Sequence, residues 1–182
     1  VPLLPIGQPF VIGTGAILTS AAVMLSVPEK AQAESAVFYY NRGIDKYDDG
    51  DYYGAISDYS KAIEINPKLF QAYYGRAILK RQLKDFYGEI ADYSKAIEIN
   101  PKFFNAYYLR GMAKSDLKDY QGAIADYSKA IEINPNNANF YFYRASSRST
   151  LKDYSGAITD YSKAIEINPR LSSAYHNRGA SK

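Results

Sequence analysis

The sequence predicts an all-α protein in which short helical hairpins stack one after another behind an apolar N-terminal segment. The main observation is an internal repeat: the string DYSKAIEINP occurs at Asp58–Pro67, Asp92–Pro101, Asp126–Pro135 and Asp160–Pro169. Its prolines, at positions 67, 101, 135 and 169, are separated by a constant 34 residues. A fixed period of this length is typical of repeat proteins built from one supersecondary unit. A single unit cannot bury its own apolar face, so neighbouring units must stack into a solenoid.

The period divides most of the chain into four units and a shorter remainder. Placing each Asn-Pro pair near the end of its unit gives residues 36–69, 70–103, 104–137 and 138–171, and leaves 172–182 as the first helix of a fifth unit or as a cap helix. In the third unit, Asn105–Leu117 and Tyr120–Ile133 show the pattern of two helices. Before the second helix of each unit stands an aspartate suited to cap it, namely Asp51, Asp85, Asp119 and Asp153. The Asn-Pro pair then ends that helix, because the residue before a proline avoids helical backbone angles.

Small and aromatic side chains recur at fixed places in these units. The first helices carry small residues at Gly43, Ala77, Gly111, Ala145 and Gly179, and aromatic residues at Tyr39, Tyr73, Tyr107, Tyr141 and Tyr175. The second helices carry an alanine–tyrosine–alanine signature at residues 55, 59 and 62, at 123, 127 and 130, and at 157, 161 and 164. With these residues the chain resembles the tetratricopeptide repeat (TPR) family over residues 36–182, which implies a right-handed α-solenoid of helix-turn-helix hairpins. The second unit departs from the pattern with Glu89, so we expect its second helix to pack less closely or to point this carboxylate outward.

Charged residues also recur with the period. The first helices carry Arg42, Arg76, Arg110, Arg144 and Arg178, and one turn later Lys46, Lys80, Lys114 and Arg148, while the second helices carry Asp58, Asp92, Asp126 and Asp160. Arginines that are removed from water need such partners. We therefore expect a ladder of Arg–Asp pairs along the stack, as a structural feature and not as a functional site.

Composition excludes several classes of function. The chain has 22 basic and 19 acidic residues and a net charge of +3. Because these charges are mixed along the sequence, it lacks the concentrated basic face of a nucleic-acid binder, and we expect no nucleic-acid partner. The absence of cysteine excludes disulfides, thiolate metal sites and cysteine nucleophiles. The 19 tyrosines suit either a recognition surface or the packed seam between helices.

The sequence offers no catalytic, cofactor-binding or metal-binding residues. His176 is the only histidine, and it stands where other units carry Tyr or Phe. No glycine-rich phosphate loop is present. The acidic run at residues 48–51 invites a calcium interpretation, but Tyr47 takes a required ligand position and Ile56 replaces the closing glutamate, so we predict a turn. We therefore expect no enzyme activity, no cofactor and no metal site.

The family resemblance implies a binding surface, because in this family the first helices line a concave face that takes extended peptides or helices. Carried onto this chain, that face displays an aromatic row of Tyr40, Tyr74, Tyr108, Phe142 and His176, a second row of Asn41, Leu109, Tyr143 and Asn177, and a third row of Ile44, Ile78 and Met112. Chaperone-binding members clamp a C-terminal carboxylate with Lys and Asn in the first unit and with Lys and Arg in the third. Those positions hold Tyr40, Ile44, Asn105 and Leu109 here, so we expect no such clamp. The trough should instead prefer an apolar or aromatic segment of a protein partner.

The N-terminal segment carries no charge before Glu29. Within it, Phe10–Val27 is an apolar run of 18 residues, longer than most signal-peptide cores and close to the lower limit for a membrane-spanning helix. The residues Ala31-Gln32-Ala33 match the small-x-small pattern that signal peptidase reads. Residues 1–35 are therefore interpreted either as a membrane anchor, with residues 9–27 in the bilayer, or as a cleaved signal, followed in both cases by a short linker.

Together these observations predict a non-enzymatic scaffold, held by one transmembrane helix with its repeats in the lumen or periplasm of a thylakoid or plasma membrane. The tight repeat consensus and the Ala-Gln-Ala pattern resemble repeat proteins of oxygenic phototrophs, some of which assist the assembly of photosynthetic complexes or stay attached to them. Two alternatives stay open. One is a soluble exported scaffold that is cleaved near Ala33, and the other is a set of regulatory repeats in a larger enzyme that extends beyond Lys182.

Overall fold

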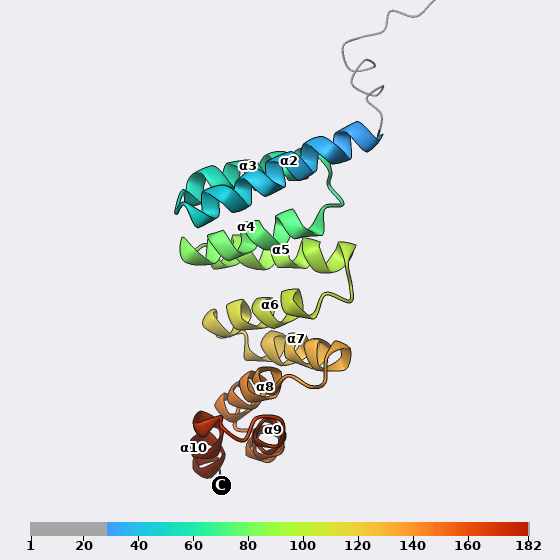
Figure 1. The fold of residues 1–182 in the computed structure, drawn as a ribbon. Coiled ribbons are helices and arrows are strands. Elements are labelled where there is room, and N and C mark those ends of the chain that lie inside the picture. The colour runs from blue at the N-terminus through green and yellow to red at the C-terminus, as the bar shows by residue number, and fades with distance from the viewer. Residues whose placement is uncertain (1–28, 182) are drawn as a thin grey trace, which may run out of the picture.

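The computed structural model describes residues 29–181, and all the regular structure in that part of the chain is helical. The helices are α2 (Glu29–Asp48), α3 (Tyr52–Ile65), α4 (Phe70–Gln82), α5 (Phe86–Ile99), α6 (Phe104–Asp116), α7 (Tyr120–Ile133), α8 (Ala138–Thr150), α9 (Tyr154–Ile167) and α10 (Ser172–Ala180). Figure 1 shows four successive hairpins, α2/α3, α4/α5, α6/α7 and α8/α9, stacked in chain order with α10 at the far end. The prediction of an all-α stack of helical hairpins is confirmed.

Each second helix begins at the predicted aspartate cap. The Oδ1 atoms of Asp51, Asp85, Asp119 and Asp153 accept hydrogen bonds of 2.9–3.0 Å from the backbone N–H of the glycine three residues later. These glycines leave no room for a side chain: a Cβ atom on Gly122 would lie 2.1 Å from Oδ2 of Asp119. The cap satisfies one of the N–H groups that a helix start leaves unpaired. The pattern Asp-x-x-Gly therefore fixes where each second helix starts.

The turn between the two helices of a unit is closed by backbone hydrogen bonds. In the second unit, the N–H of Asp85 donates to the C=O of Lys80 and the N–H of Lys84 donates to the C=O of Arg81, both at 2.9 Å. This is a Schellman turn, in which the second residue after the end of the helix adopts left-handed backbone angles. Gly50 takes this position in the first unit with φ of 80°, but lysines take it in the next three units with φ of 61–65°.

In each unit, alanines and glycines of the core pack around a large buried ring of the second helix. Tyr59, Tyr93, Tyr127 and Tyr161 of the second helices are all buried. A Cβ atom on Gly43 or Gly111 would lie 2.7 Å from the ring of the tyrosine in the same unit. The alanine–tyrosine–alanine signature is thus a packing device, because small residues on facing helices make the space that each ring fills.

Two sequence-based expectations are corrected by the structure. Helix α2 begins at Glu29, within the segment that was interpreted as a short linker up to residue 35. Of the two alternatives for Glu89, the outward-pointing carboxylate is wrong: the side chain is fully buried, at the position where the other units have buried alanine. The apolar run 10–27 lies outside the described residues. Among the described helices, none combines the length and the apolar character needed to cross a bilayer.

Candidate functional site

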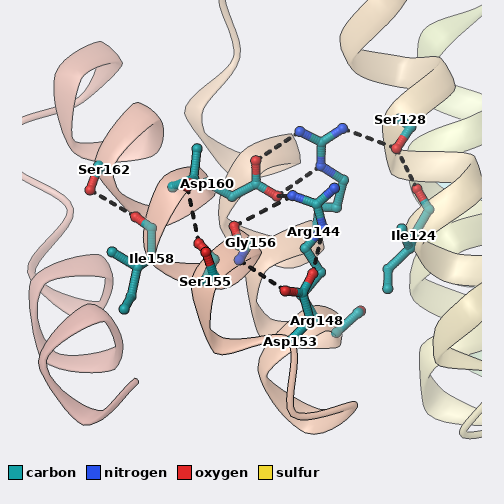
Figure 2. Close-up of polar contacts among 12 residues, drawn as sticks. Ile124, Ser128, Arg144, Arg148, Asp153, Ser155, Gly156, Ile158, Asp160 and Ser162 are labelled. Atoms are coloured by element: carbon teal, nitrogen blue, oxygen red, sulfur yellow. Dashed lines mark hydrogen bonds and ion pairs between the residues drawn. The ribbon is translucent and has the colours of Figure 1, made fainter. Parts of the chain in front are cut away.

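A polar framework runs through the stack and takes up most of the positive charge of the first helices. Figure 2 shows it in the fourth unit, where Nε and Nη2 of Arg144 donate to the two carboxylate oxygens of Asp160 at 2.8 and 2.7 Å. Arg148 donates to the same carboxylate at 2.8 Å. The third nitrogen of Arg144 donates to Oγ of Ser128, which lies on the preceding unit, at 3.0 Å. The arginine therefore joins two units as well as two helices.

The same arrangement recurs in the other units, and the predicted ladder of Arg–Asp pairs is confirmed. The pairs are Arg42–Asp58, Arg76–Asp92, Arg110–Asp126 and Arg144–Asp160. Hydrogen bonding to Arg42 is the main cause that lowers the pKa of Asp58 below its usual value, against the effect of its burial. The link to a serine of the preceding unit was not predicted. It recurs as Ser60–Arg76, Ser94–Arg110, Ser128–Arg144 and Ser162–Arg178, always across 16 residues.

The predicted aromatic row lies on the edge of the core. Tyr40, Tyr74, Tyr108 and Phe142 are half-buried, and each ring packs against the buried tyrosine of its own unit with centroids 5.7–6.2 Å apart. Burial raises the pKa of Tyr40, Tyr74 and Tyr108, so these phenols stay neutral at physiological pH. Each ring thus presents one face to the core and leaves part of its surface to solvent. His176, the fifth member of the row, is exposed on α10.

The other two predicted rows are less uniform. Ile78 and Met112 are half-buried and Ile44 is exposed. Leu109 packs on the core cluster around Tyr93, whereas the ring of Tyr143 lies 5.7 Å from that of Tyr108 and so connects the third unit to the fourth. Asn41 is exposed and Asn177 is half-buried. We use the name first-helix face for the surface formed by the three rows, that is Tyr40, Asn41, Ile44, Tyr74, Ile78, Tyr108, Leu109, Met112, Phe142, Tyr143, His176 and Asn177.

An ion pair lies one turn beyond Ile78 and Met112 on the first helices. Nη2 of Arg81 contacts Oδ2 of Asp116 at 2.7 Å, and Nη1 of Arg81 contacts Oε1 of the buried Glu89 at 3.1 Å. The side chains of Arg81 and Asp116 are 30% and 43% exposed, so both can meet a partner. The second oxygen of Glu89 and the hydroxyl of Tyr93 are buried without a hydrogen-bond partner among the described residues. This cluster of Arg81, Glu89 and Asp116 was not predicted from the sequence. The sequence feature that indicates it is Glu89, which replaces the alanine of the other units.

A cavity of about 240 Å³ lies where α8 meets α10. Its polar lining consists of Ser146, Ser149, Thr150, Tyr161, Asn177 and Ser181. Of these, only Asn177 was predicted as a site residue. The cavity depends on side chains from three helices that come together only in the fold, so no local sequence pattern could indicate it.

No unit carries the lysine and arginine side chains that would clamp a C-terminal carboxylate at the four positions expected for them. The four positions in question are the second, fifth, sixth and ninth of each unit. They carry no Lys or Arg in any unit, from Val37, Tyr40, Asn41 and Ile44 in the first to Ser173, His176, Asn177 and Ala180 in the last. The first-helix face is therefore largely neutral, with Arg81 and Asp116 as its neighbouring charges.

The comparison with solved structures agrees with this architecture. A crystal structure of MamA protein has 25% identity, covers 81% of each chain and gives a TM-score of 0.78. The first TPR of Spaghetti (RPAP3), bound to the HSP90 peptide SRMEEVD, has 26% identity and a TM-score of 0.63, over 65% of this chain and 94% of that one. The TPR domain of Arabidopsis OM64 has 27% identity and a TM-score of 0.62, over 65% and 98%. A comparison with curated protein sequences found no match.

Family models match the whole repeat region. Models described as tetratricopeptide repeat match residues 36–69, 70–103, 104–137 and 127–159, and a model described as TPR repeat matches residues 150–181. These matches cover all of α3 to α10 and all of α2 except its first seven residues. The chain therefore belongs to the tetratricopeptide repeat family.

Proposed function

We propose that this protein is a non-enzymatic scaffold whose first-helix face binds a segment of a protein partner that is rich in apolar or aromatic residues. The observation that carries the proposal is the row of half-buried, neutral rings of Tyr40, Tyr74, Tyr108 and Phe142 on successive first helices. Rings of this kind supply large contact areas at low cost in conformational entropy, and such residues dominate the energetics of protein interfaces. The non-enzymatic character is part of the same proposal and rests on the sequence.

Charge supports an apolar partner over an acidic one. Arg76, Arg110 and Arg144 bind aspartates within the stack, and Arg81 is shared between Glu89 and Asp116. The Spaghetti relative binds a peptide with three acidic residues. A peptide of that kind would bury its carboxylates on this face without a cation to pair them, which costs free energy. We therefore expect this chain to bind peptides through apolar contacts.

The test uses a library of random peptides displayed on phage and selected on the full 182-residue chain. The double variant Ile78→Ser with Met112→Ser changes the face without damage to the core, since Ser146 is the native residue at the equivalent position of the fourth unit. We expect selected peptides to be rich in apolar residues and to bind this variant about 30-fold more weakly, because it removes two apolar contacts worth about 1 kcal/mol each.

The control is the double variant Tyr53→Ser with Tyr87→Ser on the second helices, where these side chains are 74% and 78% exposed. It should bind the selected peptides as the wild type does. Equal affinity for all three proteins, or selection of no peptide at all, would contradict the assignment of the first-helix face as a binding site.

We propose in addition that residues 9–27 hold the scaffold at a membrane, where it would serve the assembly of a membrane complex such as a photosynthetic one. The apolar run supports a membrane association. Retention of this segment is supported by helix α2, which runs through Ala31-Gln32-Ala33, so that cleavage near Ala33 would cut a helix. Intact mass spectrometry of the protein from its native source distinguishes the anchor from the soluble exported form, and sedimentation with vesicles, with and without residues 1–28, tests the membrane association itself.

A further inference from the structure

The cavity between α8 and α10 lies where two facing positions of the first-helix face, Ser146 and Asn177, both carry small or polar side chains. At the position of Asn177, the first and second units carry Asn41 and Gly75, and the third and fourth carry Leu109 and Tyr143. At the position of Ser146, the first three units carry Ile44, Ile78 and Met112. At the two preceding junctions the facing positions hold Ile78 with Leu109 and Met112 with Tyr143, whereas Ser146 and Asn177 line a volume of about 240 Å³ here. The cavity is therefore a local exception on an otherwise apolar face.

The lining is polar but carries no acidic or basic side chain. It contains five hydroxyl groups and the carboxamide of Asn177. Thr150 and Ser181 donate their hydroxyl protons to backbone carbonyl groups, at 3.0 and 2.9 Å. Burial raises the pKa of Tyr161, and hydrogen bonds with Asn177 and Ser146 oppose this rise, so the three groups lie together and Tyr161 keeps its proton. Ser146, Tyr161 and Asn177 are thus the groups that can both donate to and accept from a ligand.

This chemistry selects among the groups that a partner could insert. A charged group would lose part of its hydration without gaining an opposite charge, and an apolar group would form no hydrogen bond with the lining. A carboxamide offers two N–H donors and one carbonyl acceptor on a flat, neutral head. That set matches hydroxyls and an amide that each donate and accept. The volume also exceeds what a single water molecule needs, so there is room for a side chain.

We propose that this cavity binds the carboxamide of an Asn or Gln side chain of the partner segment that lies on the first-helix face. The inference rests on the proposed function, because the cavity continues the face: Asn177 occupies on α10 the position that Tyr143 occupies on α8. The partner then has a mixed motif. Its apolar residues contact the rings of the first four units, and its carboxamide enters the junction of α8 and α10.

The test compares the full chain with the double variant Ser146→Met with Asn177→Leu. This variant fills the cavity with Met and Leu, the residues that stand at the equivalent positions of the third unit, Met112 and Leu109. The phage-displayed library of random peptides is selected on both proteins. We expect a fixed Asn or Gln among peptides selected on the wild type and none among those selected on the filled variant, with the apolar residues common to both sets.

A synthetic peptide from the wild-type selection gives the quantitative measurement. Replacement of its Asn or Gln by Leu should weaken binding to the wild type by about 3- to 10-fold, the range expected for one net hydrogen bond. The same replacement should not weaken binding to the filled variant. The single variant Asn177→Ala only removes atoms and cannot overpack the junction, and it should also abolish the difference between the two peptides.

The outcomes separate this inference from the proposed function. Peptides rich in apolar residues but without a preferred carboxamide would overturn the inference and leave the proposed function standing. An equal effect of the peptide replacement on the wild type and on both variants would overturn it as well. If no peptide is selected on any of the proteins, the proposed function fails and the inference fails with it.

Discussion

Glu89 is the residue at which this chain departs most from its own repeat. Ala55, Ala123 and Ala157 occupy the same position in the other units and are fully buried, as Glu89 is. The carboxylate keeps one hydrogen bond to Arg81, while its other oxygen has no partner among the described residues. Burial raises the pKa of Glu89, and the nearby Arg81 only partly offsets this effect. The folded state therefore disfavours the ionised form of this side chain.

This raised pKa predicts a specific dependence of stability on pH. A carboxyl group with a higher pKa in the folded than in the unfolded state stabilises the fold below its ordinary pKa of about 4.3, and that contribution is lost as the pH rises through the raised value. Glu89→Gln keeps the shape of the side chain but cannot titrate. We expect the melting temperature of the variant to rise relative to that of the wild type between about pH 4 and pH 8.

Thermal melts followed by circular dichroism across this range measure the effect. Glu98→Gln, at a side chain that is 67% exposed, controls for the loss of one surface carboxylate. A constant difference between the wild type and Glu89→Gln at every pH would show that Glu89 does not carry a raised pKa.

At the level of single residues, the sequence predicted repeated contacts better than unique ones. The Arg–Asp pairs could be predicted because both members recur with the period and carry opposite charge. The serines that join neighbouring units recur as well, but a serine at an exposed-looking helical position has many uses, and only the fold shows that Ser94 faces Arg110. The burial of Glu89 could not be predicted, because burying a carboxylate opposes the usual preference for water.

At the level of elements, the hairpin depends on a cap and a glycine that act together. Asp119 caps α7 by accepting from the N–H of Gly122, and its Oδ2 atom occupies the place that a Cβ atom on Gly122 would need. Helix propensity alone predicts that Gly→Ala stabilises a helix by about 1 kcal/mol. The cap predicts the opposite sign here, because an alanine would displace the aspartate and remove a contribution of about 1 kcal/mol or more.

We therefore expect Gly122→Ala to lower the free energy of unfolding by up to about 1 kcal/mol, the amount by which a cap contribution of up to about 2 kcal/mol exceeds the gain in helix propensity. Gly179 in α10 is the matched control, since no atom lies within 4 Å of the place where its Cβ would be. Gly179→Ala should leave stability unchanged or raise it. Urea titrations of both variants test the difference, and a stabilising effect of Gly122→Ala would show that the cap adds little to α7.

Most helix ends could be predicted from the sequence because each has a local cause. The aspartate cap fixes the start of every second helix, and the Asn-Pro pair fixes its end. The start of α2 had no such cause at residue 36. Residues 29–35 are rich in Ala, Glu, Lys and Gln, which favour a helix, so the helix continues upstream to Glu29. The repeat period therefore predicts the boundary of the unit but not the boundary of this helix.

At the level of the whole molecule, the stack is joined by the hydrogen bonds from arginines to the serines of preceding units. In such proteins stability is approximately a sum of terms within units and terms between neighbours. The triple variant of Ser60, Ser94 and Ser128 to alanine removes three links between units and leaves every Arg–Asp pair in place. We expect a loss of about 1 kcal/mol for each link, and a broader unfolding transition as the units become less coupled.

Urea titration of the far-ultraviolet circular dichroism signal measures both the midpoint and the slope of this transition. Ser57→Ala, at an exposed position of α3, serves as the control. A triple variant that unfolds with the midpoint and slope of the wild type would show that the serines do not couple the units.

The candidate site could be predicted in part at this scale. The three rows of the first-helix face follow from the repeat, since a position in one unit has the same environment in the next. The ion pair of Arg81 with Asp116 and the cavity at Asn177 could not be predicted in this way. Both form where two neighbouring units differ from the consensus together, so they depend on pairs of exceptions and not on the pattern itself.

The identical serine–arginine link has a consequence for how such a gene can change length. Ser60, Ser94 and Ser128 each accept a hydrogen bond from an arginine 16 residues later. If recombination removed one period of 34 residues, Ser60 would lie 16 residues before Arg110, or Ser94 before Arg144, and the same hydrogen bond could form. Duplication of a period would likewise create a junction that already exists elsewhere in the stack. The boundary between the second and third units resists such exchange, since Arg81 there contacts both Glu89 and Asp116.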